Sequence, residues 1–302
     1  MTTRAVVVLG PTASGKSDIA MNAAMSVGET HIVACDSMQV YRRMDIGTAK
    51  PTAADRAAVP HHGLDLCEPG ERFTVSRFAD DIASARRAID AAGARELVVG
   101  GTGLYLTAIT DGLTMPGEWP EIRAELESDP DTASLFARLS DLDPTAATRM
   151  EPNNRRRIIR ALEVCIGSGE PFSSFGEGVA TFPDNGVTYI GIRWQRDALR
   201  ERIARRVLLM VDSGLVDEVR GLLAEPGGLS PTAAQALGYK EMIDHVNGLM
   251  SLEDAVTDVI LRTQQFAVRQ ERWFRRDPRI RWVDVVNDPV GEVTPFVIAA
   301  LS

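Results

Sequence analysis

The residues with the clearest chemical potential form one short stretch near the start of the chain. They are Gly10-Pro11-Thr12-Ala13-Ser14-Gly15-Lys16-Ser17, which matches G-x-x-x-x-G-K-[ST] between an apolar segment and a helix-like segment. The glycines let the backbone curl, so that successive N–H groups and a helix N-terminus face an oligophosphate. Lys16 adds a mobile positive charge, and the Ser17 hydroxyl can hold Mg²⁺. We therefore expect this loop to bind a diphosphate or a longer phosphate chain.

A phosphate-binding loop does not determine which atom is attacked. A kinase directs a nucleophile to phosphorus, whereas the same loop can hold a diphosphate leaving group while carbon is attacked. NTPases usually place an acidic residue at the end of an apolar strand to reach Mg²⁺. Here Leu97-Val98-Val99 runs into Gly100-Gly101-Thr102-Gly103, and the substitute, Asp284, lies in a segment that we expect to be a peripheral strand. The sequence therefore favours chemistry other than ATP hydrolysis.

Two further polar residues follow apolar, strand-like segments. Asp36 comes directly after His31–Cys35, and Thr102 follows Leu97–Val99. Ligands of open parallel sheets bind beyond the carboxyl ends of the strands, so both side chains should face the phosphate loop. A carboxylate there can act as a general base, and a hydroxyl can donate to a phosphate oxygen. Taken alone, Asp36 fits a helix-cap or turn role equally well, and for Thr102 a packing or turn role is the more common explanation of an isolated hydroxyl after glycines.

Longer motifs help to decide whether Asp36 and Thr102 are catalytic or structural residues. They are the phosphate loop, Asp36–Pro51, GGTGLY at Gly100–Tyr105 and RALE at Arg160–Glu163, supported by Val59–His62, Gln235–Glu241 and Arg269–Arg276. Together they closely resemble the tRNA dimethylallyltransferases, also called tRNA isopentenyltransferases, over nearly the whole chain. The resemblance implies transfer of a dimethylallyl group from dimethylallyl diphosphate to the exocyclic N6 of the adenine on the 3′ side of the tRNA anticodon.

The implied reaction assigns roles to the residues already described. An adenine amine is a weak nucleophile, and Asp36 is the candidate for the base that removes its proton. Lys16, the loop N–H groups, Mg²⁺ on Ser17 and Thr102 would stabilise the departing diphosphate. Arg202 and Arg206, one helical turn apart, either face the same anion or lie on a solvated helix face.

The reacting adenine must leave its stack before its amine can meet a buried diphosphate. The resemblance assigns tRNA contacts to the following residues: Asp36, Ser37, Met38, Gln39, Thr102, Arg123, Arg156, Arg157, Ile158, Ile159 and Arg160. Members of the family commonly have Gln where this chain has Arg156, so a phosphate or base-edge contact would replace an amide contact there.

Arginines are concentrated in two segments. One holds Arg155, Arg156, Arg157 and Arg160, and the other holds Arg269, Arg272, Arg275, Arg276, Arg279 and Arg281. Such runs commonly form solvated helix faces, but dense clusters in a chain of net charge −9 equally fit a local anion-binding groove.

The elements that position these residues alternate between apolar strands and helices. Ala5–Leu9, His31–Cys35, Leu97–Val99 and Val187–Ile192 read as buried strands, which predicts an α/β fold with a P-loop-type parallel sheet covered by helices. Strand-like runs are absent between them from about Thr114 to Asn185, where short helical segments alternate with prolines. We predict a catalytic core of residues 1–114 and 187–302, with a mostly helical insertion domain for tRNA at 115–186.

Composition limits the remaining possibilities. The chain has 302 residues, of which 44% are hydrophobic and 25% charged, and its apolar runs are too short to cross a bilayer. Its three cysteines lie far apart and predict buried thiols rather than disulfides or a metal site. No signal peptide is indicated, and we expect a cytoplasmic monomer that binds no membrane.

Three other functions compete with tRNA prenylation. In a small-molecule P-loop kinase, Asp36 would activate a hydroxyl and the insertion would close over ATP. A prenyltransferase acting on free adenine nucleotides would use the same catalytic residues but leave the arginine clusters without a role. A non-enzymatic alternative is an RNA-binding protein switched by a nucleotide.

Overall fold

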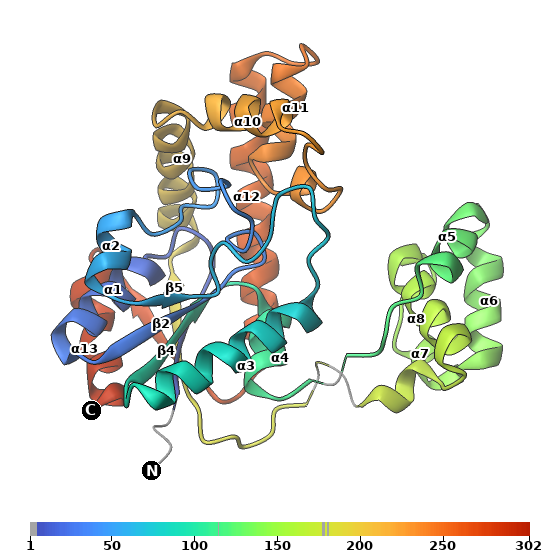
Figure 1. The fold of residues 1–302 in the computed structure, drawn as a ribbon, viewed down its shortest axis with the longest axis horizontal. Helices are drawn as coiled ribbons and strands as arrows, with labels where there is room; N and C mark the ends of the chain where they lie inside the picture. Colours follow the sequence, from blue (N-terminus) through green and yellow to red (C-terminus); the bar gives the residue numbers. More distant parts are fainter. Residues whose placement is uncertain (1–4, 114, 177–178, 180) are drawn as a thin grey trace. The chain divides into compact units, whose positions relative to one another are not determined.

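A computed structural model describes residues 5–113, 115–176, 179 and 181–302 (Figure 1). The chain forms two compact units. The first comprises Met1–Asp111 and Phe182–Ser302, and the second comprises Gly112–Thr181. We call them the α/β unit and the helical unit. The predicted end of the first core segment, Thr114, lies outside the described residues.

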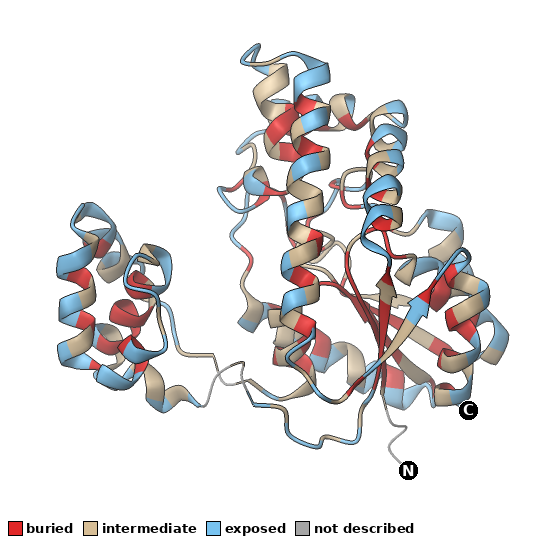
Figure 2. Ribbon diagram, turned by 180° about the vertical axis from the view of Figure 1, so that it is seen from behind, coloured by how far each residue is buried: buried red, intermediate tan, exposed pale blue. Residues whose placement is uncertain are grey.

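A six-stranded sheet, parallel throughout, forms the centre of the α/β unit, with strand order β3-β2-β4-β1-β5-β6. The strands are β1 (Val6–Leu9), β2 (Thr30–Cys35), β3 (His61–His62), β4 (Arg95–Gly100), β5 (Thr188–Trp194) and β6 (Ile280–Val285). The central strands are apolar and buried because helices cover both of their faces, as Figure 2 shows. This arrangement confirms the predicted P-loop-type α/β fold.

Helices cover the two faces of this sheet in pairs. Helix α1 (Lys16–Val27) packs against α13 (Pro289–Leu301), and α3 (Val75–Ala91) packs against α4 (Gly103–Thr110). The first pair lies on one face of the sheet and the second pair on the other (Figure 1). The short helix α2 (Ala53–Ala58) precedes β3.

A second group of helices lies beyond the carboxyl ends of the strands (Figure 1). It contains α9 (Arg196–Asp212), α10 (Leu215–Ala224), η3 (Ala233–Gln235), α11 (Tyr239–Val246) and α12 (Leu252–Phe274). Helices α9 and α12 pack against each other. Because ligands of parallel sheets bind at this edge, these helices are positioned to contribute to a site there.

The helical unit has its own small core. Its elements are α5 (Pro120–Ser128), α6 (Thr132–Leu142), α7 (Pro144–Thr148), α8 (Arg155–Ser168) and the 3-10 helix η1 (Phe172–Phe175). Leu126, Leu139, Ile158 and Leu162 pack together at its centre. The apolar spacing along α8 therefore sets which of its side chains face the core.

Several smaller predictions can be compared with this fold. The segment near Trp282 is an edge strand, as predicted, whereas the two-residue strand β3 was not foreseen. Cys35, Cys67 and Cys165 are buried free thiols. The described helices include none whose length and hydrophobicity would suffice to span a bilayer.

Candidate active site

The loop between β1 and α1 adopts a backbone that depends on glycine. Gly15 has φ of +93°, and a Cβ there would press on the ring of Pro289. Three backbone carbonyl groups of the loop accept hydrogen bonds from side chains. Lys16 Nζ donates to the carbonyl of Pro11 (2.7 Å), Arg202 Nε to that of Ala13 (2.9 Å), and Trp194 Nε1 to that of Ser14 (3.1 Å). The first N–H groups of α1 have no helical partner and stay available to an anion.

This loop forms one wall of a cavity of about 440 Å³. Residues Thr12–Ser17 line it, together with Asp36, Gln39 and Arg206. Gly10 and Pro11 are buried behind the loop, where Gly10 abuts Ile192. Six of the eight predicted phosphate-binding residues therefore reach the cavity, which we call the phosphate cavity.

Two cations in the phosphate cavity lack a full set of partners. Burial, with the nearby Arg206, lowers the pKa of Lys16 to about 7. Burial also lowers the pKa of Arg206, although the carboxylates of Asp36 and Asp18 oppose that shift. Among the residues that the structure describes, none forms a hydrogen bond or ion pair with the Arg206 side chain. Desolvated cations of this kind are stabilised by a bound anion, so the cavity suits a diphosphate.

A second cavity, of about 350 Å³, adjoins the first and is largely apolar. Val207, Met210, Leu215 and Val259 contribute to its wall. The two cavities share six lining residues: Thr12, Ala13, Asp36, Thr48, Arg206 and Phe266. We call the second one the apolar cavity. Asp36 thus lies where a space for an anion meets a space for an apolar group.

The backbone after β2 holds Asp36 and Thr102 together. Asp36 Oδ1 accepts the N–H of Met38 (2.8 Å), and Thr102 Oγ1 accepts the N–H of Ser37 (3.2 Å). Ser37, Met38 and Thr102 line the apolar cavity, whereas Gln39 lines the phosphate cavity. Thr102 therefore lies beside the base candidate and on the apolar side of the junction.

Helix α10 anchors the loop that carries Thr48 to the rest of the site. Glu218 accepts the N–H groups of Asp45 (2.9 Å), Ile46 (2.7 Å) and Gly47 (3.2 Å), and the hydroxyl of Tyr239 (2.6 Å). A carboxylate that accepts several N–H bonds fixes a loop that has no secondary structure of its own.

A residue without an assigned role, Gln270 on α12, connects two parts of the site. Its Oε1 accepts the N–H of Thr12 (2.9 Å), and its Nε2 donates to the carbonyl of Gly101 (2.9 Å). A Cβ at Gly101 would collide with Gln270, and one at Gly103 would collide with Trp273, so the GGTG motif permits the close approach of α12. A glutamine among the buried positions of an amphipathic helix was the sequence signal for this role.

The residues present fit a magnesium ion that is held mainly by its substrate. Ser17 is exposed in the phosphate cavity beside Asp18. The described residues include no group of three or more His, Cys, Asp or Glu side chains that could hold a metal. Mg²⁺ is commonly bound by one or two protein oxygens plus phosphate oxygens and water, which matches this donor set.

In the helical unit, two of the predicted tRNA-binding arginines have internal partners. Arg123 and Arg160 form ion pairs with Glu163, at 3.2 and 3.1 Å, and the Glu163 side chain is fully buried. Glu163 also accepts the N–H of Trp119 (2.9 Å). Arg155 donates to the carbonyls of Leu126, Glu127 and Asp129. Arg123 and Arg155 thus connect α5 to α8, while Arg160 bonds α8 to the carbonyls of Pro116 and Gly117 before α5.

The other predicted residues of α8 divide by their position on the helix. Ile158 and Ile159 are buried in the core of the helical unit, so their side chains present no surface to RNA. Arg156 and Arg157 are exposed, and neither guanidinium group has a hydrogen bond or ion pair with a described residue. The basic surface of this helix is therefore narrower than the sequence run suggested.

Comparison with known proteins identifies relatives over most of the chain. Residues 39–277 match the family described as IPP transferase. A tRNA dimethylallyltransferase 1 of Citrifermentans bemidjiense is 44% identical and covers 93% of this chain and 92% of its own. A tRNA dimethylallyltransferase of Bifidobacterium animalis is 41% identical and covers 98% of this chain and 86% of its own.

Solved structures are also similar to this chain over nearly its whole length. The tRNA isopentenylpyrophosphate transferase of Bacillus halodurans has a TM-score of 0.70 and 36% identity, over 99% of this chain and 97% of that chain. A eukaryotic dimethylallyltransferase acting on tRNA has a TM-score of 0.82 over 99% of this chain and 78% of that chain. At 24% identity, the second likeness concerns the fold alone.

Proposed function

The chain belongs to the IPP transferase family, that of the tRNA dimethylallyltransferases, and from this premise we propose its reaction. The protein transfers a dimethylallyl group from dimethylallyl diphosphate to the exocyclic N6 of the adenine on the 3′ side of a tRNA anticodon, and it releases diphosphate. Asp36, Thr102 and Lys16 are the proposed catalytic residues.

The observation that supports this proposal most strongly is the position of Asp36 between two unlike cavities. An allylic diphosphate has a charged end and an apolar end, and its reactive carbon joins them. The phosphate cavity offers Lys16 and Arg206, while the apolar cavity offers aliphatic side chains. A kinase acting on a polar metabolite would leave that apolar wall without a function, so prenyl transfer accounts for more of the site.

The proposed step breaks one bond and forms another at the same carbon. The adenine N6 attacks C1 of the dimethylallyl group, and the C1–O bond breaks with its electron pair leaving on the diphosphate. Asp36 takes the N6 proton as the C–N bond forms, which prevents positive charge from building up on the attacking nitrogen. Lys16, Arg206 and the N–H groups of the loop stabilise the charge that develops on the leaving group.

Thr102 and Gln270 would support these groups from opposite sides. The Thr102 hydroxyl accepts the Ser37 N–H and keeps its own proton available to a phosphate oxygen or to the acceptor. Gln270 would hold the loop and the Gly101 turn in register. A Mg²⁺ ion held by Ser17 and the diphosphate would neutralise part of the leaving group's charge.

The acceptor would contact residues of both units. In the α/β unit we propose Asp36, Ser37, Met38, Gln39 and Thr102, which border the two cavities. In the helical unit we propose Arg156 and Arg157, because they are exposed and have no side-chain partner among the described residues. We also propose that the enzyme is a cytoplasmic monomer.

A labelling experiment tests the proposed function. The purified protein is incubated with Mg²⁺ and dimethylallyl diphosphate labelled in its carbon chain, with unmodified tRNA or AMP as acceptor. A parallel reaction contains ATP labelled in its γ-phosphate and a pool of small hydroxylated metabolites. Label in tRNA alone is the expected result. Label in AMP would indicate a free-nucleotide acceptor, and transfer from ATP to a metabolite would indicate a kinase, so either outcome would overturn the proposal.

A further inference from the structure

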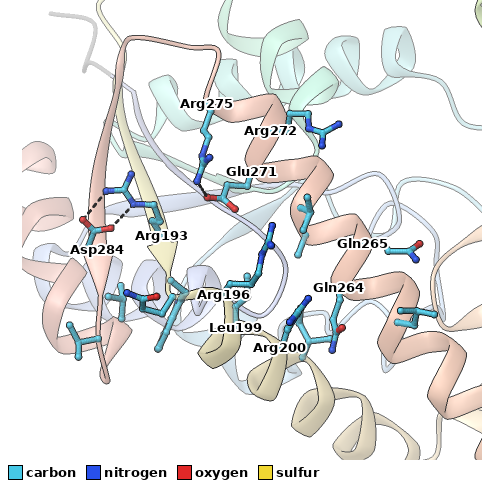
Figure 3. A pocket seen from close by; sticks show the side chains of 18 residues that line it. Arg193, Arg196, Leu199, Arg200, Gln264, Gln265, Glu271, Arg272, Arg275 and Asp284 are labelled. Atoms are coloured by element: carbon cyan, nitrogen blue, oxygen red, sulfur yellow. Dashed lines mark hydrogen bonds and ion pairs between the residues drawn. The ribbon is translucent and has the colours of Figure 1, made fainter.

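A large groove on the α/β unit contains an arginine cluster that the proposed reaction does not use. It has a volume of about 880 Å³, twice that of the phosphate cavity, and Figure 3 shows it between α9, α12 and the ends of β5 and β6. Its arginines are Arg193, Arg196, Arg200, Arg272 and Arg275. We call this feature the arginine groove.

The charges in the arginine groove are incompletely neutralised. Arg193 pairs with Asp284 and Arg275 with Glu271, the two carboxylates that line the groove (Figure 3). Arg196 has no hydrogen bond or ion pair with any described residue, and it extends from α9 into the space between β6 and α12. Arg200 has one long ion pair, 3.4 Å, with the exposed Asp197. In a chain of net charge −9, the groove is thus a local positive region.

The groove lies behind the reaction site. Helix α12 separates the two spaces, because Val268 lines the arginine groove whereas Val259 and Phe266, on the opposite face of that helix, line the apolar cavity. Ile203 of α9 lines both spaces. An α-helix with its side chains is about 10–12 Å across. Phosphates a few nucleotides from a base held beside Asp36 can therefore reach the arginine groove.

The lining chemistry favours a phosphodiester backbone over bases. Guanidinium groups bind phosphate oxygens in a bidentate manner, and the amides of Gln264 and Gln265 add further donors. Base recognition on single strands needs an exposed aromatic face. The groove has only Trp194 among its lining aromatics, and that side chain is buried with Arg202 stacked on its ring.

We propose that the arginine groove binds the phosphate backbone of the tRNA substrate, outside the loop that enters the active site. This inference rests on the proposed function, because it assigns the groove to the same acceptor. It predicts contacts that add affinity regardless of nucleotide sequence and that weaken as salt is added.

The test compares two double variants of equal charge change. Arg196→Gln with Arg200→Gln removes two charges from the groove. Arg87→Gln with Arg220→Gln is the control, because both residues are exposed, neither lines the cavities described above, and Arg220 pairs with Asp217 as Arg200 does with Asp197. Binding of unmodified tRNA, and of a tRNA whose acceptor adenine is replaced, is measured between 50 and 300 mM KCl, about the range over which phosphate contacts are sensitive.

The groove variant should bind both tRNAs about five- to tenfold more weakly at 150 mM KCl, and its salt slope should fall by about 1.5, as expected for two lost phosphate contacts. Its KM for dimethylallyl diphosphate, and its kcat at saturating tRNA, should match those of the wild type. An unchanged tRNA affinity and salt slope, or an equal loss in the control, would overturn the inference.

Two further measurements distinguish RNA from small phosphate compounds as the ligand of the groove, and distinguish failure of this inference from failure of the proposed function. In the first, inorganic diphosphate and ATP are titrated into the wild-type protein and both variants, and their affinities are measured. If only these small anions lose affinity in the groove variant, the groove binds a free phosphate compound and the assignment to RNA is wrong. If the wild-type protein transfers no label to tRNA, the proposed function itself fails; if it does and the groove variant binds tRNA normally, only the present inference fails.

Discussion

The phosphate cavity of the α/β unit and the α5–α8 contact of the helical unit both place arginine near carboxylate, but they differ in how far the charges are satisfied. Glu163 is fully buried and has two arginines and one backbone N–H as partners. The Arg206 side chain has no hydrogen bond or ion pair with any described residue, and the pKa of Lys16 beside it is lowered to about 7. The first arrangement is complete without a ligand, whereas the second is complete only when an anion binds.

This difference separates residues that the sequence presents as equivalent. Arg160 and Arg206 both lie on helices within arginine-rich runs. Truncating a satisfied ion-paired residue leaves a buried partner charge uncompensated and costs stability. Truncating an unsatisfied cation relieves repulsion in the free protein and costs ligand affinity. The comparison therefore predicts opposite kinds of defect from similar substitutions.

The largest expected effect concerns Asp36, which lies at the junction of the two cavities. Asp36→Asn keeps the acceptor for the Met38 N–H but removes the base, so kcat should fall about 10²- to 10⁴-fold while the KM values for both substrates change little. Single-turnover transfer to tRNA measures the chemical step directly. A wild-type rate in this variant would exclude Asp36 as the base.

Next in size is the loss of an unsatisfied cation. Arg206→Gln should lower kcat/KM for dimethylallyl diphosphate about 10- to 100-fold, the range expected for one charge-assisted hydrogen bond. Its melting temperature should be equal to or above that of the wild type. The matched variant Arg160→Gln should show the reverse pattern, with lower stability and near-normal kcat. If Arg206→Gln were the less stable protein and Arg160→Gln the less active one, the distinction drawn between the two sites would be wrong.

Removing the shared carboxylate tests the satisfied network. Glu163→Gln should destabilise the helical unit by about 2 kcal/mol, because a buried carboxylate loses its charge while Arg123 and Arg160 keep theirs. The value is below the 3–5 kcal/mol typical of fully buried pairs, since both arginines retain about a fifth of their side-chain exposure. Hydrogen exchange within 112–181 would detect the loss separately from the α/β unit. Unchanged protection there would show that the ion pairs contribute little.

The smallest expected effect is a pH dependence of diphosphate binding. Burial and Arg206 lower the pKa of Lys16 to about 7, so the lysine of the free protein loses its charge as the pH rises through 7. An anion binds the protonated form better, and its affinity should fall about fivefold between pH 7 and 8. Calorimetry with inorganic diphosphate measures this change. Lys16→Met should bind more weakly and show a flatter profile, and an equally steep profile in this variant would assign the titration to another group.

Much of the fold and part of the site could be predicted from the sequence because their determinants are local. The short, unbroken apolar runs of β1, β2, β4 and β5 indicate buried strands by themselves. The phosphate loop is a contiguous motif between a strand and a helix. Asp36 and Thr102 follow strand ends, so the parallel topology alone brings them to one edge.

Other features depend on which helix faces meet. Successive residues of an α-helix point about 100° apart around its axis. Whether an arginine of α8 faces solvent or Glu163 therefore depends on its exact position in the helix and on how α5 packs against it. The sequence run from Arg155 to Arg160 therefore predicted a basic surface, of which only Arg156 and Arg157 are both exposed and without side-chain partners among the described residues.

The sequence by itself determined the parallel sheet, the phosphate loop and the family, since each rests on neighbouring residues or on motifs of fixed spacing. Only the tertiary structure decided that Gln270, 258 positions away, would bond Thr12, that Arg206 would remain without a partner beside Lys16, and that Arg160 would pair with a buried carboxylate. The physical reason is that hydrogen-bond satisfaction and desolvation depend on every element packed around a side chain, and no local pattern records that packing.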